Sequence, residues 1–398
     1  MPVARHRRGP NNVHTFYKLP PTRGYTPFNI QRNSRFASLR LASRELGDAK
    51  EATIPIEFSE INKLHFEELP NLRGFSCGDM VEWPILKHVI LNNSPNLKKF
   101  GLGTIKESQL KRFILEEEEQ IDIDIKILHL FELSLSLETL KMLYMKNQNF
   151  EKLWQNNCHS KSFYELEYLT LSSNKKLLNV ISSNIIIRLN KLKKLTLEQC
   201  EVLTEIFYLE DDKPTGNIQE LLPQLQELAL SYLRSFTCIW NMEPSVSFFP
   251  NLLSLHIVHC GTLQSLFSIS STKNLQNLKS LKLCNCDKLE EVISIDNRED
   301  MTVSFPKMEC LVLKDLPKLL SFHQQNGTIH LPNIQIMRAR NIPSMKFFSV
   351  GIVITPLLRS IHVTFARKLW LGNLNETLSY ISNNPGKFHF AKLFGFPS

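Results

Sequence analysis

The feature that most constrains this chain is a spacing that recurs along most of its length. Three stretches align without gaps on the frame L-x-x-L-x-L-x-x-[C/N/L]-x-x-L-x-x-[I/L/V/F], namely Leu192–Ile206, Leu252–Leu266 and Leu278–Val292. The frame begins about twelve times, and the starts, each counted as position 1, are Ile61, Leu86, Leu110, Leu140, Leu166, Leu192, Leu225, Leu252, Leu278, Met308, Ile334 and Leu358. Successive starts lie 24 to 33 residues apart, and a period in this range is typical of a solenoid.

The physical meaning of the frame follows from its two periods. The L-x-L alternation at positions 4 to 6 predicts a short strand with one buried face, and the three-residue steps after it turn the chain away. One such unit cannot bury its apolar side alone, so neighbouring units must stack. We therefore predict an α/β solenoid in the shape of a horseshoe. It has short parallel strands on its inner, concave side and irregular or short helical segments on its convex side.

The ends of the chain lack the frame. Residues 1–55 are rich in Arg, Pro and Asn, and this composition predicts a basic, disordered segment. The repeat domain is expected over residues 56–372, and residues 373–398 are expected to form an irregular tail. Solenoids need polar caps, but neither end shows a recognisable one.

Charge and cysteine usage exclude several classes of protein. The formal charge of +8 lies entirely in the first fifty residues, so the repeat region is neutral and nucleic acid is not an expected partner. No apolar run approaches the roughly 20 residues that cross a bilayer, and the charged start Met1–Arg8 has no apolar stretch behind it, so we expect neither a membrane contact nor a secretory signal. The eight cysteines form no Cys-x-x-Cys pair, and we interpret them as reduced thiols of an intracellular protein.

Residues 60–370 resemble the leucine-rich-repeat region of plant intracellular immune receptors of the coiled-coil, nucleotide-binding, leucine-rich-repeat type. The resemblance rests on C-D-K-L-E-E-V-I at 286–293, on K-D-L-P-K-L at 314–319, and on the openings S-F-P-K-M at 304–308 and F-F-P-N-L at 248–252. It implies a cytoplasmic defence protein, related to disease resistance proteins, whose repeats sense pathogen effectors and restrain a nucleotide-driven switch.

The chain departs from that family because the motif of the switch is missing. A P-loop needs G-x-x-x-x-G-K-[ST], whereas the single Gly-Lys pair, Gly386-Lys387, is followed by Phe388. We therefore expect no nucleotide and no other cofactor. The chain is expected to be a truncated receptor, a partial gene product or a stand-alone repeat protein.

No arrangement of residues predicts an enzyme. The run His256-x-x-His259-Cys260 has the residue types of a metal site, but the frame directs the histidines outward and Cys260 inward, so we expect no metal. Glu116–Glu119 is interpreted as a solvated face, and no Ser-His-Asp arrangement is recognisable.

The concave surface remains as the candidate site, because positions 5 and 7 of each unit project onto it. Acidic residues lie early along this surface and basic residues late, which favours an electrically polarised groove for a protein partner of opposite pattern. The candidate binding residues are His256, Lys282, Lys314, Arg338, Arg340, His362, Glu67, Glu116, Tyr144 and Glu198.

The predicted function is protein recognition in plant innate immunity. The partner is expected to be a pathogen effector, a guarded host protein or a receptor domain. Two alternatives stay open: a substrate-receptor-like subunit of a ubiquitin ligase, for which residues 1–55 offer no F-box-like helical module, and a non-functional receptor fragment.

Overall fold

The computed structural model describes most of the repeat region. The described residues are 29–32, 56–57, 59–71, 81–96, 109–122, 137–151, 153, 162–209, 219–294, 301–364, 366–384 and 387. The predicted disordered segment 1–55 lies outside them except for β1 (Asn29–Arg32), which pairs antiparallel with the first strand of the repeats.

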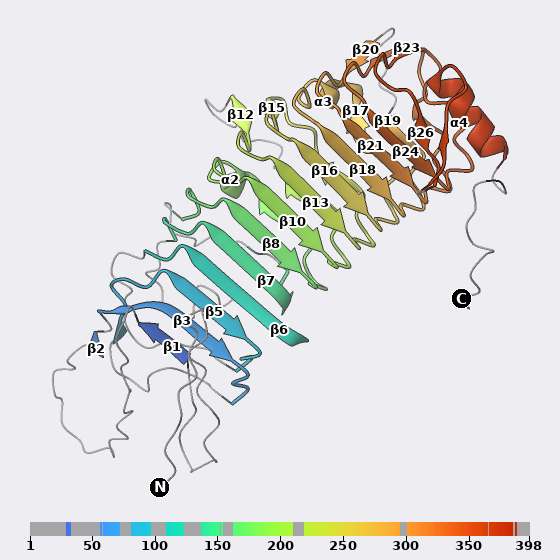
Figure 1. Ribbon diagram of the computed structural model, residues 1–398. Helices are drawn as coiled ribbons and strands as arrows, with labels where there is room; N and C mark the ends of the chain where they lie inside the picture. The colour runs from blue at the N-terminus through green and yellow to red at the C-terminus, as the bar shows by residue number, and fades with distance from the viewer. Residues whose placement is uncertain are drawn as a thin grey trace, which may run out of the picture.

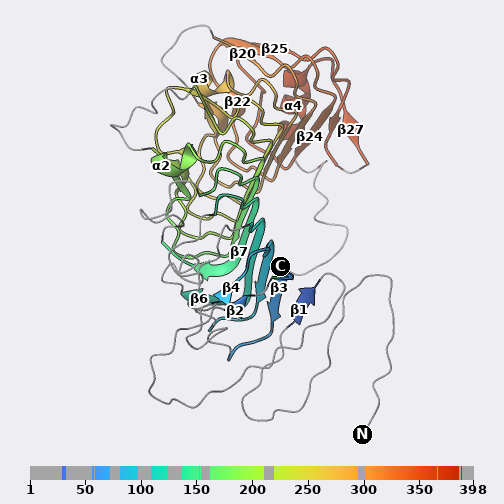
Figure 2. The same cartoon turned by 90° about the vertical axis from the view of Figure 1, so that its left-hand side faces the viewer.

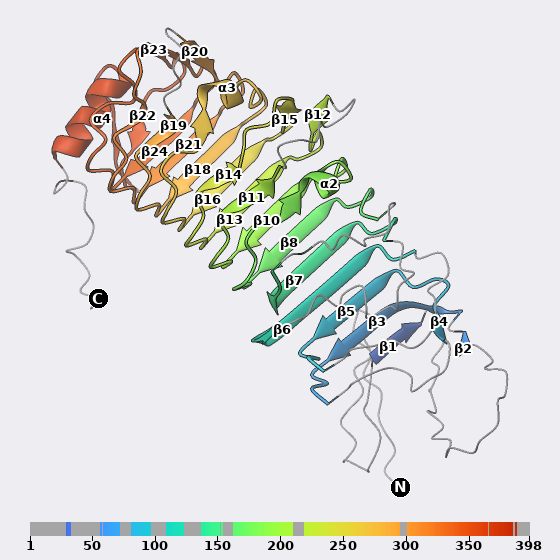
Figure 3. The same ribbon diagram turned by 180° about the vertical axis from the view of Figure 1, so that it is seen from behind.

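One large sheet runs through the whole described chain and makes an elongated, open stack (Figure 1; Figure 3 shows it from behind). It has fourteen strands, of which the two outermost, β1 and β27 (Lys368–Leu369), pair antiparallel with their neighbours. The twelve between them are parallel, one for each start of the sequence frame. They are β3 (Ile61–Glu67), β5 (His88–Asn92), β6 (Arg112–Asp122), β7 (Met142–Asn149), β8 (Tyr168–Ser172), β10 (Lys194–Glu198), β13 (Glu227–Ser231), β16 (Ser254–Val258), β18 (Ser280–Cys284), β21 (Cys310–Lys314), β24 (Ile336–Arg340) and β26 (Ile361–His362).

The spine of the solenoid consists of the residues at positions 1, 4 and 6. In the unit that starts at Leu192, Leu195 and Leu197 are both fully buried, and the frame-start residue of all twelve units is at most 3% exposed. The buried residues form one continuous core cluster from Ile61 to Ile381. The predicted solenoid of parallel strands over a shared apolar core is confirmed.

The chain leaves each strand through a left-handed residue at position 8. Ten described units have φ between 48° and 59° there, at Glu68, Asn93, Asn147, Ser173, Gln199, Tyr232, His259, Asn285, Asp315 and Asn341. This conformation costs a non-glycine residue about 1 kcal/mol, and it turns the next residue inward. At position 9, Asn174 is buried and its side chain accepts the amides of Lys176 and Leu177 while it donates to the carbonyl of Phe150.

The convex side carries more strand than the sequence predicts (Figure 2). Besides the short helices α2 (Ser183–Ile186) and α3 (Ile269–Thr272), it has five small parallel sheets. Their strands are β2 (Ile56–Glu57), β4 (Val81–Glu82), β9 (Ile181–Ser182), β11 (Glu205–Tyr208), β14 (Cys238–Trp240), β12 (Glu220–Leu221), β15 (Ser247–Phe248), β17 (Phe267–Ser268), β19 (Glu291–Ser294), β22 (Ser321–His323), β20 (Met301–Ser304), β23 (Gly327–His330) and β25 (Ile352–Ile354). Phenylalanines stack beneath them, with the rings of Phe322 and Phe348 4.6 Å apart.

The C-terminal end of the described repeats has a helical cap over residues 374–383, where the sequence predicts an irregular tail from residue 373; residues 388–398 of that tail lie outside the described residues. Helix α4 (Leu374–Asn383) is capped by Asn373, whose side chain accepts the amide of Glu376. Its apolar face follows the helical spacing of Leu374, Leu378 and Ile381, which are buried at the end of the core. The sequence does not predict this helix because its ten residues include only these three apolar residues at helical spacing.

Candidate functional site

The register of the large sheet brings the predicted binding residues into two straight rows. In the row of position 5, the pairing of adjacent strands aligns His256 with Lys282, Lys282 with Val312, Val312 with Arg338, and Arg338 with His362. Tyr144 lies further along the same row. The row of position 7 holds Glu67, Glu116, Glu198, Lys314 and Arg340. Because positions 4 and 6 are buried, both rows face outward from the sheet.

The basic end of the surface is compact. Lys314 and Arg340 are paired residues on β21 and β24, and Arg338 is exposed on β24. The ammonium of Lys314 lies 3.3 Å from the carboxylate of Asp315, its neighbour at position 8. Three cationic side chains therefore lie on two adjacent strands, which are roughly 5 Å apart.

One of the acidic residues is neutralised by a neighbour. Glu116 forms an ion pair of 2.7 Å with Lys146 on the next strand. Glu67 lies 3.9 Å from the ring of His65, but burial lowers the pKa of that ring. The gradient from acidic to basic that the sequence predicts is found along position 7. It is not found along positions 2 and 3, which carry cations at the N-terminal end.

The two predicted histidines are held in their neutral form. Burial, followed by the charge of Lys282, lowers the pKa of His256. Burial, followed by Lys368 and Arg338, lowers the pKa of His362. At neutral pH the charge of the C-terminal part of the sheet face therefore comes from its lysines and arginines.

A ladder of side chains at position 8 borders the face, and it is not among the binding residues that the sequence predicts. The rings of Tyr232 and His259 stack at 4.5 Å, and the amide of Asn285 lies 2.7 Å from Nε2 of His259. Tyr232 is 47% exposed. The signal in the sequence is an aromatic residue, Tyr232, at a position where the adjacent repeats carry the polar residues Gln199 and His259.

These contacts also account for the candidate metal ligands. His259 belongs to the ladder, whereas Cys260 is buried and points to the core, and burial raises the pKa of its thiol to about 12. The two residues diverge, as the frame predicts. Over the described part of the chain, no group of three His, Cys, Asp or Glu residues has the geometry to hold a metal ion.

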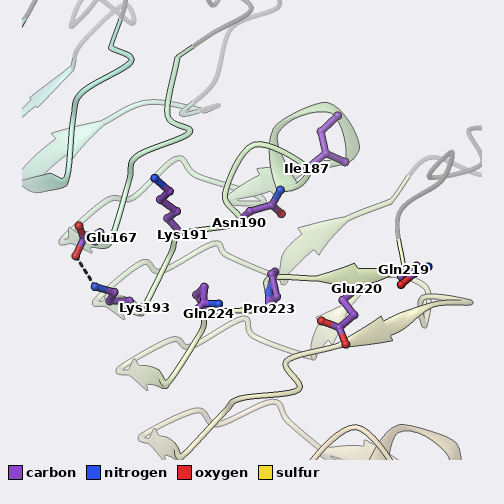
Figure 4. Close-up of a pocket in the computed structure, with 9 residues that line it drawn as sticks. All are labelled: Glu167, Ile187, Asn190, Lys191, Lys193, Gln219, Glu220, Pro223 and Gln224. Atoms are coloured by element: carbon purple, nitrogen blue, oxygen red, sulfur yellow. Dashed lines mark hydrogen bonds and ion pairs between the residues drawn. The ribbon is translucent and has the colours of Figure 1, made fainter.

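A surface groove of about 620 Å³ lies beside the sheet, at the long unit that starts at Leu192. Figure 4 shows Lys191 and Asn190 on one wall and Gln219 and Glu220 on the other. Its lysines already have partners, because Lys191 is paired with Glu165 at 2.5 Å and Lys193 with Glu167 at 2.8 Å. A groove whose charges are neutralised internally offers little to a charged ligand.

The described residues contain no helix that is long and apolar enough to cross a bilayer.

The fold and the face together define the class of this protein. It has leucine-rich repeats, because its parallel strands stack over a wholly buried spine and turn polar side chains outward.

The comparison with protein families finds a match for the middle of the chain. Residues 136–287 match the family described as plant disease resistance protein RPS2-like, leucine-rich repeats, so this part of the chain is similar to the repeat region of plant resistance proteins. Among curated proteins the chain has no match. One similar solved structure is the plant peptide hormone receptor RGFR1 in complex with RGF2. It is 13% identical, with a TM-score of 0.22, and the alignment covers 78% of this chain and 72% of the receptor.

Proposed function

We propose that this chain is a protein-recognition module of plant defence, acting in the cytoplasm, and that it binds a protein partner on the outward face of its large sheet. The partner is a pathogen effector, a guarded host protein or a receptor domain. The match of residues 136–287 to resistance-protein repeats supports the defence role. The proposal includes no catalytic step.

The observation that carries the proposal is the contrast between the two sides of the large sheet. Positions 4 and 6 are buried along the whole core, while the predicted polar and charged binding residues line up at positions 5 and 7 on the outward side. A rigid row of charged groups at strand spacing gives a surface that selects a partner by complementary charge. The cluster of Lys314, Arg338 and Arg340 is the part with the highest charge density among the predicted residues.

The test is a capture experiment with the full chain as bait in extracts of pathogen-challenged plant tissue. The triple variant Lys314→Glu, Arg338→Glu and Arg340→Glu is expected to lose the partner that the wild type retains, with a fall in affinity of at least about tenfold. Identified partners are then measured with purified protein.

The matched control reverses three exposed lysines outside the large sheet, Lys273, Lys288 and Lys318. It changes the net charge by the same amount and should keep the partner. If both triple variants retain the partner equally, the basic end of the face is not part of the binding site.

A further inference from the structure

The first three repeats carry a second cluster of cations on the outward face, at the edge where the strands begin. We name Lys63, Lys87, His88, Lys111 and Arg112 the N-terminal basic cluster. The sheet register aligns Lys63 with His88 and His88 with Arg112. Lys87 and Lys111 precede two of these residues, and the amide of Lys111 donates to the carbonyl of Lys87 at 2.8 Å. Five basic side chains thus lie across three strands, within roughly 10 Å.

The lysines at the same positions of later repeats are neutralised, and those of the cluster are not. Lys141 and Lys193 both contact Glu167 at 2.8 Å, and Lys194 contacts Glu227 at 2.7 Å. Among the described residues, the four permanent cations of the cluster form no ion pair. Positions 2 and 3 of the first three repeats contain no acid that could supply one.

The histidine of the cluster reports this excess of positive charge. Burial lowers the pKa of His88, and the four cations Arg112, Lys63, Lys87 and Lys111 each lower it further. No carboxylate contributes in the opposite direction. An anion placed on this surface would relieve repulsion that the protein alone leaves in place.

The surroundings select the kind of anion. Ile90 and Ile114 occupy position 5 beside the cluster and are only partly buried, so they offer apolar contact. Beyond them, Glu67 and Glu116 at position 7 would repel any anion that extended across the face, so the charges of the ligand must stay along the edge where the strands begin. A narrow strip of cations beside aliphatic side chains fits an extended acidic peptide with apolar residues.

We propose that the N-terminal basic cluster binds an acidic, extended segment of a partner protein, with carboxylates at Lys87, Lys111 and Arg112 and an apolar side chain over Ile90 and Ile114. This inference rests on the proposed function in assigning the sheet face to protein recognition. It adds a second subsite, at the opposite end from Lys314 and Arg340.

The test uses the full chain and a fluorescein-labelled peptide of alternating glutamate and leucine, about ten residues long and so able to cross three strands. Fluorescence anisotropy should detect binding that weakens between about 50 and 200 mM NaCl. The triple variant Lys87→Glu, Lys111→Glu and Arg112→Glu should raise the dissociation constant at least about tenfold. The basic segment 1–50 is present in every variant and adds the same background.

Two controls test whether binding depends on the position of the charges on the protein and on the carboxylates of the peptide. The variant with Lys273, Lys288 and Lys318 reversed has the same net charge and should bind the peptide as the wild type does. A peptide of glutamine and leucine should not bind. The inference is overturned if both triple variants bind equally, or if a single-stranded DNA oligomer binds more tightly than the acidic peptide.

The triple variant of Lys314, Arg338 and Arg340 separates this inference from the proposed function. It should bind the acidic peptide normally while it loses the captured partner. Loss of peptide binding in this variant would contradict a separate N-terminal subsite. Peptide binding that survives when no partner is captured would count against the proposed function alone.

Discussion

Glu117 is the residue whose environment departs furthest from the repeat frame. It occupies position 8, where ten other units adopt the left-handed turn, but here strand β6 continues and the side chain is only 3% exposed. One carboxylate oxygen accepts the amide of Ser94 at 3.1 Å. Burial outweighs this hydrogen bond and raises the pKa of Glu117 to about 7.

This environment makes stability depend on pH through one residue. Because the pKa of Glu117 is higher in the folded chain than its ordinary value, folding takes up a proton. The contribution of protonated Glu117 to stability is therefore complete below about pH 4.5 and is lost as the pH rises through 7. Glu117→Gln keeps an acceptor for Ser94 and cannot ionise. We expect the free energy of unfolding of this variant to exceed that of the wild type by about 1–3 kcal/mol at pH 8 and to equal it near pH 4.

The measurement is urea unfolding of both proteins at the two pH values. Glu116→Gln is the matched control, because this neighbour lies on the outward face and is paired with Lys146. A stability difference between Glu117→Gln and wild type that stays constant with pH would show that Glu117 ionises normally.

At the scale of single elements, the convex strands depend on close backbone contact. Gly351 precedes β25, and a Cβ atom at this position would overlap the carbonyl oxygen of Gly327, at the start of β23. No side chain fits between these two turns. We expect Gly351→Ala to separate β25 from β23 and to destabilise the C-terminal repeats by about 2–4 kcal/mol.

Gly261→Ala is the matched control, since a Cβ there has nothing within 4 Å. The midpoint of thermal unfolding should fall for the first variant and stay within about 2 °C of wild type for the second. Equal midpoints would mean that the contact between Gly351 and Gly327 relaxes without cost.

The inner strands could be predicted from the sequence, and the outer ones could not. Leu195 and Leu197 specify a strand because alternation is a local signal. Strand β11 contains adjacent buried residues, Ile206 and Phe207, because it is covered on both faces, so no alternation marks it. The sequence frame predicts the two rows of the candidate site. It does not predict which charges are paired, because ion pairs such as Lys146 with Glu116 form between repeats.

At the scale of the whole molecule, a solenoid unfolds as a series of neighbouring units. Helix α4 closes the C-terminal end, where the side chain of Asn375 accepts the amide of Phe348 at 2.7 Å and donates to the carbonyl of Ser349 at 3.0 Å. Leu378→Asp places a charge in the buried face of this helix. We expect the last repeats to open locally while the central repeats stay folded.

Hydrogen exchange measured by mass spectrometry checks this expectation. In Leu378→Asp, protection should fall in residues 334–364 and persist in residues 166–292. Ser379→Asp, next to Leu378 on the less buried side of α4, is the control and should leave both regions protected. Loss of protection along the entire chain would show that the solenoid behaves as one cooperative unit.

The repeats differ in length by up to nine residues, yet neighbouring strands stay in register: β10 and β13 align residue by residue across the longest unit. The differences in length therefore lie outside the aligned strands. An insertion between Leu209 and Gln219, for instance an epitope tag, is therefore expected to leave the order of the side chains on the outward face of the large sheet unchanged. In this architecture, the part of each repeat that varies in length is decoupled from the sheet face that we propose as the binding surface.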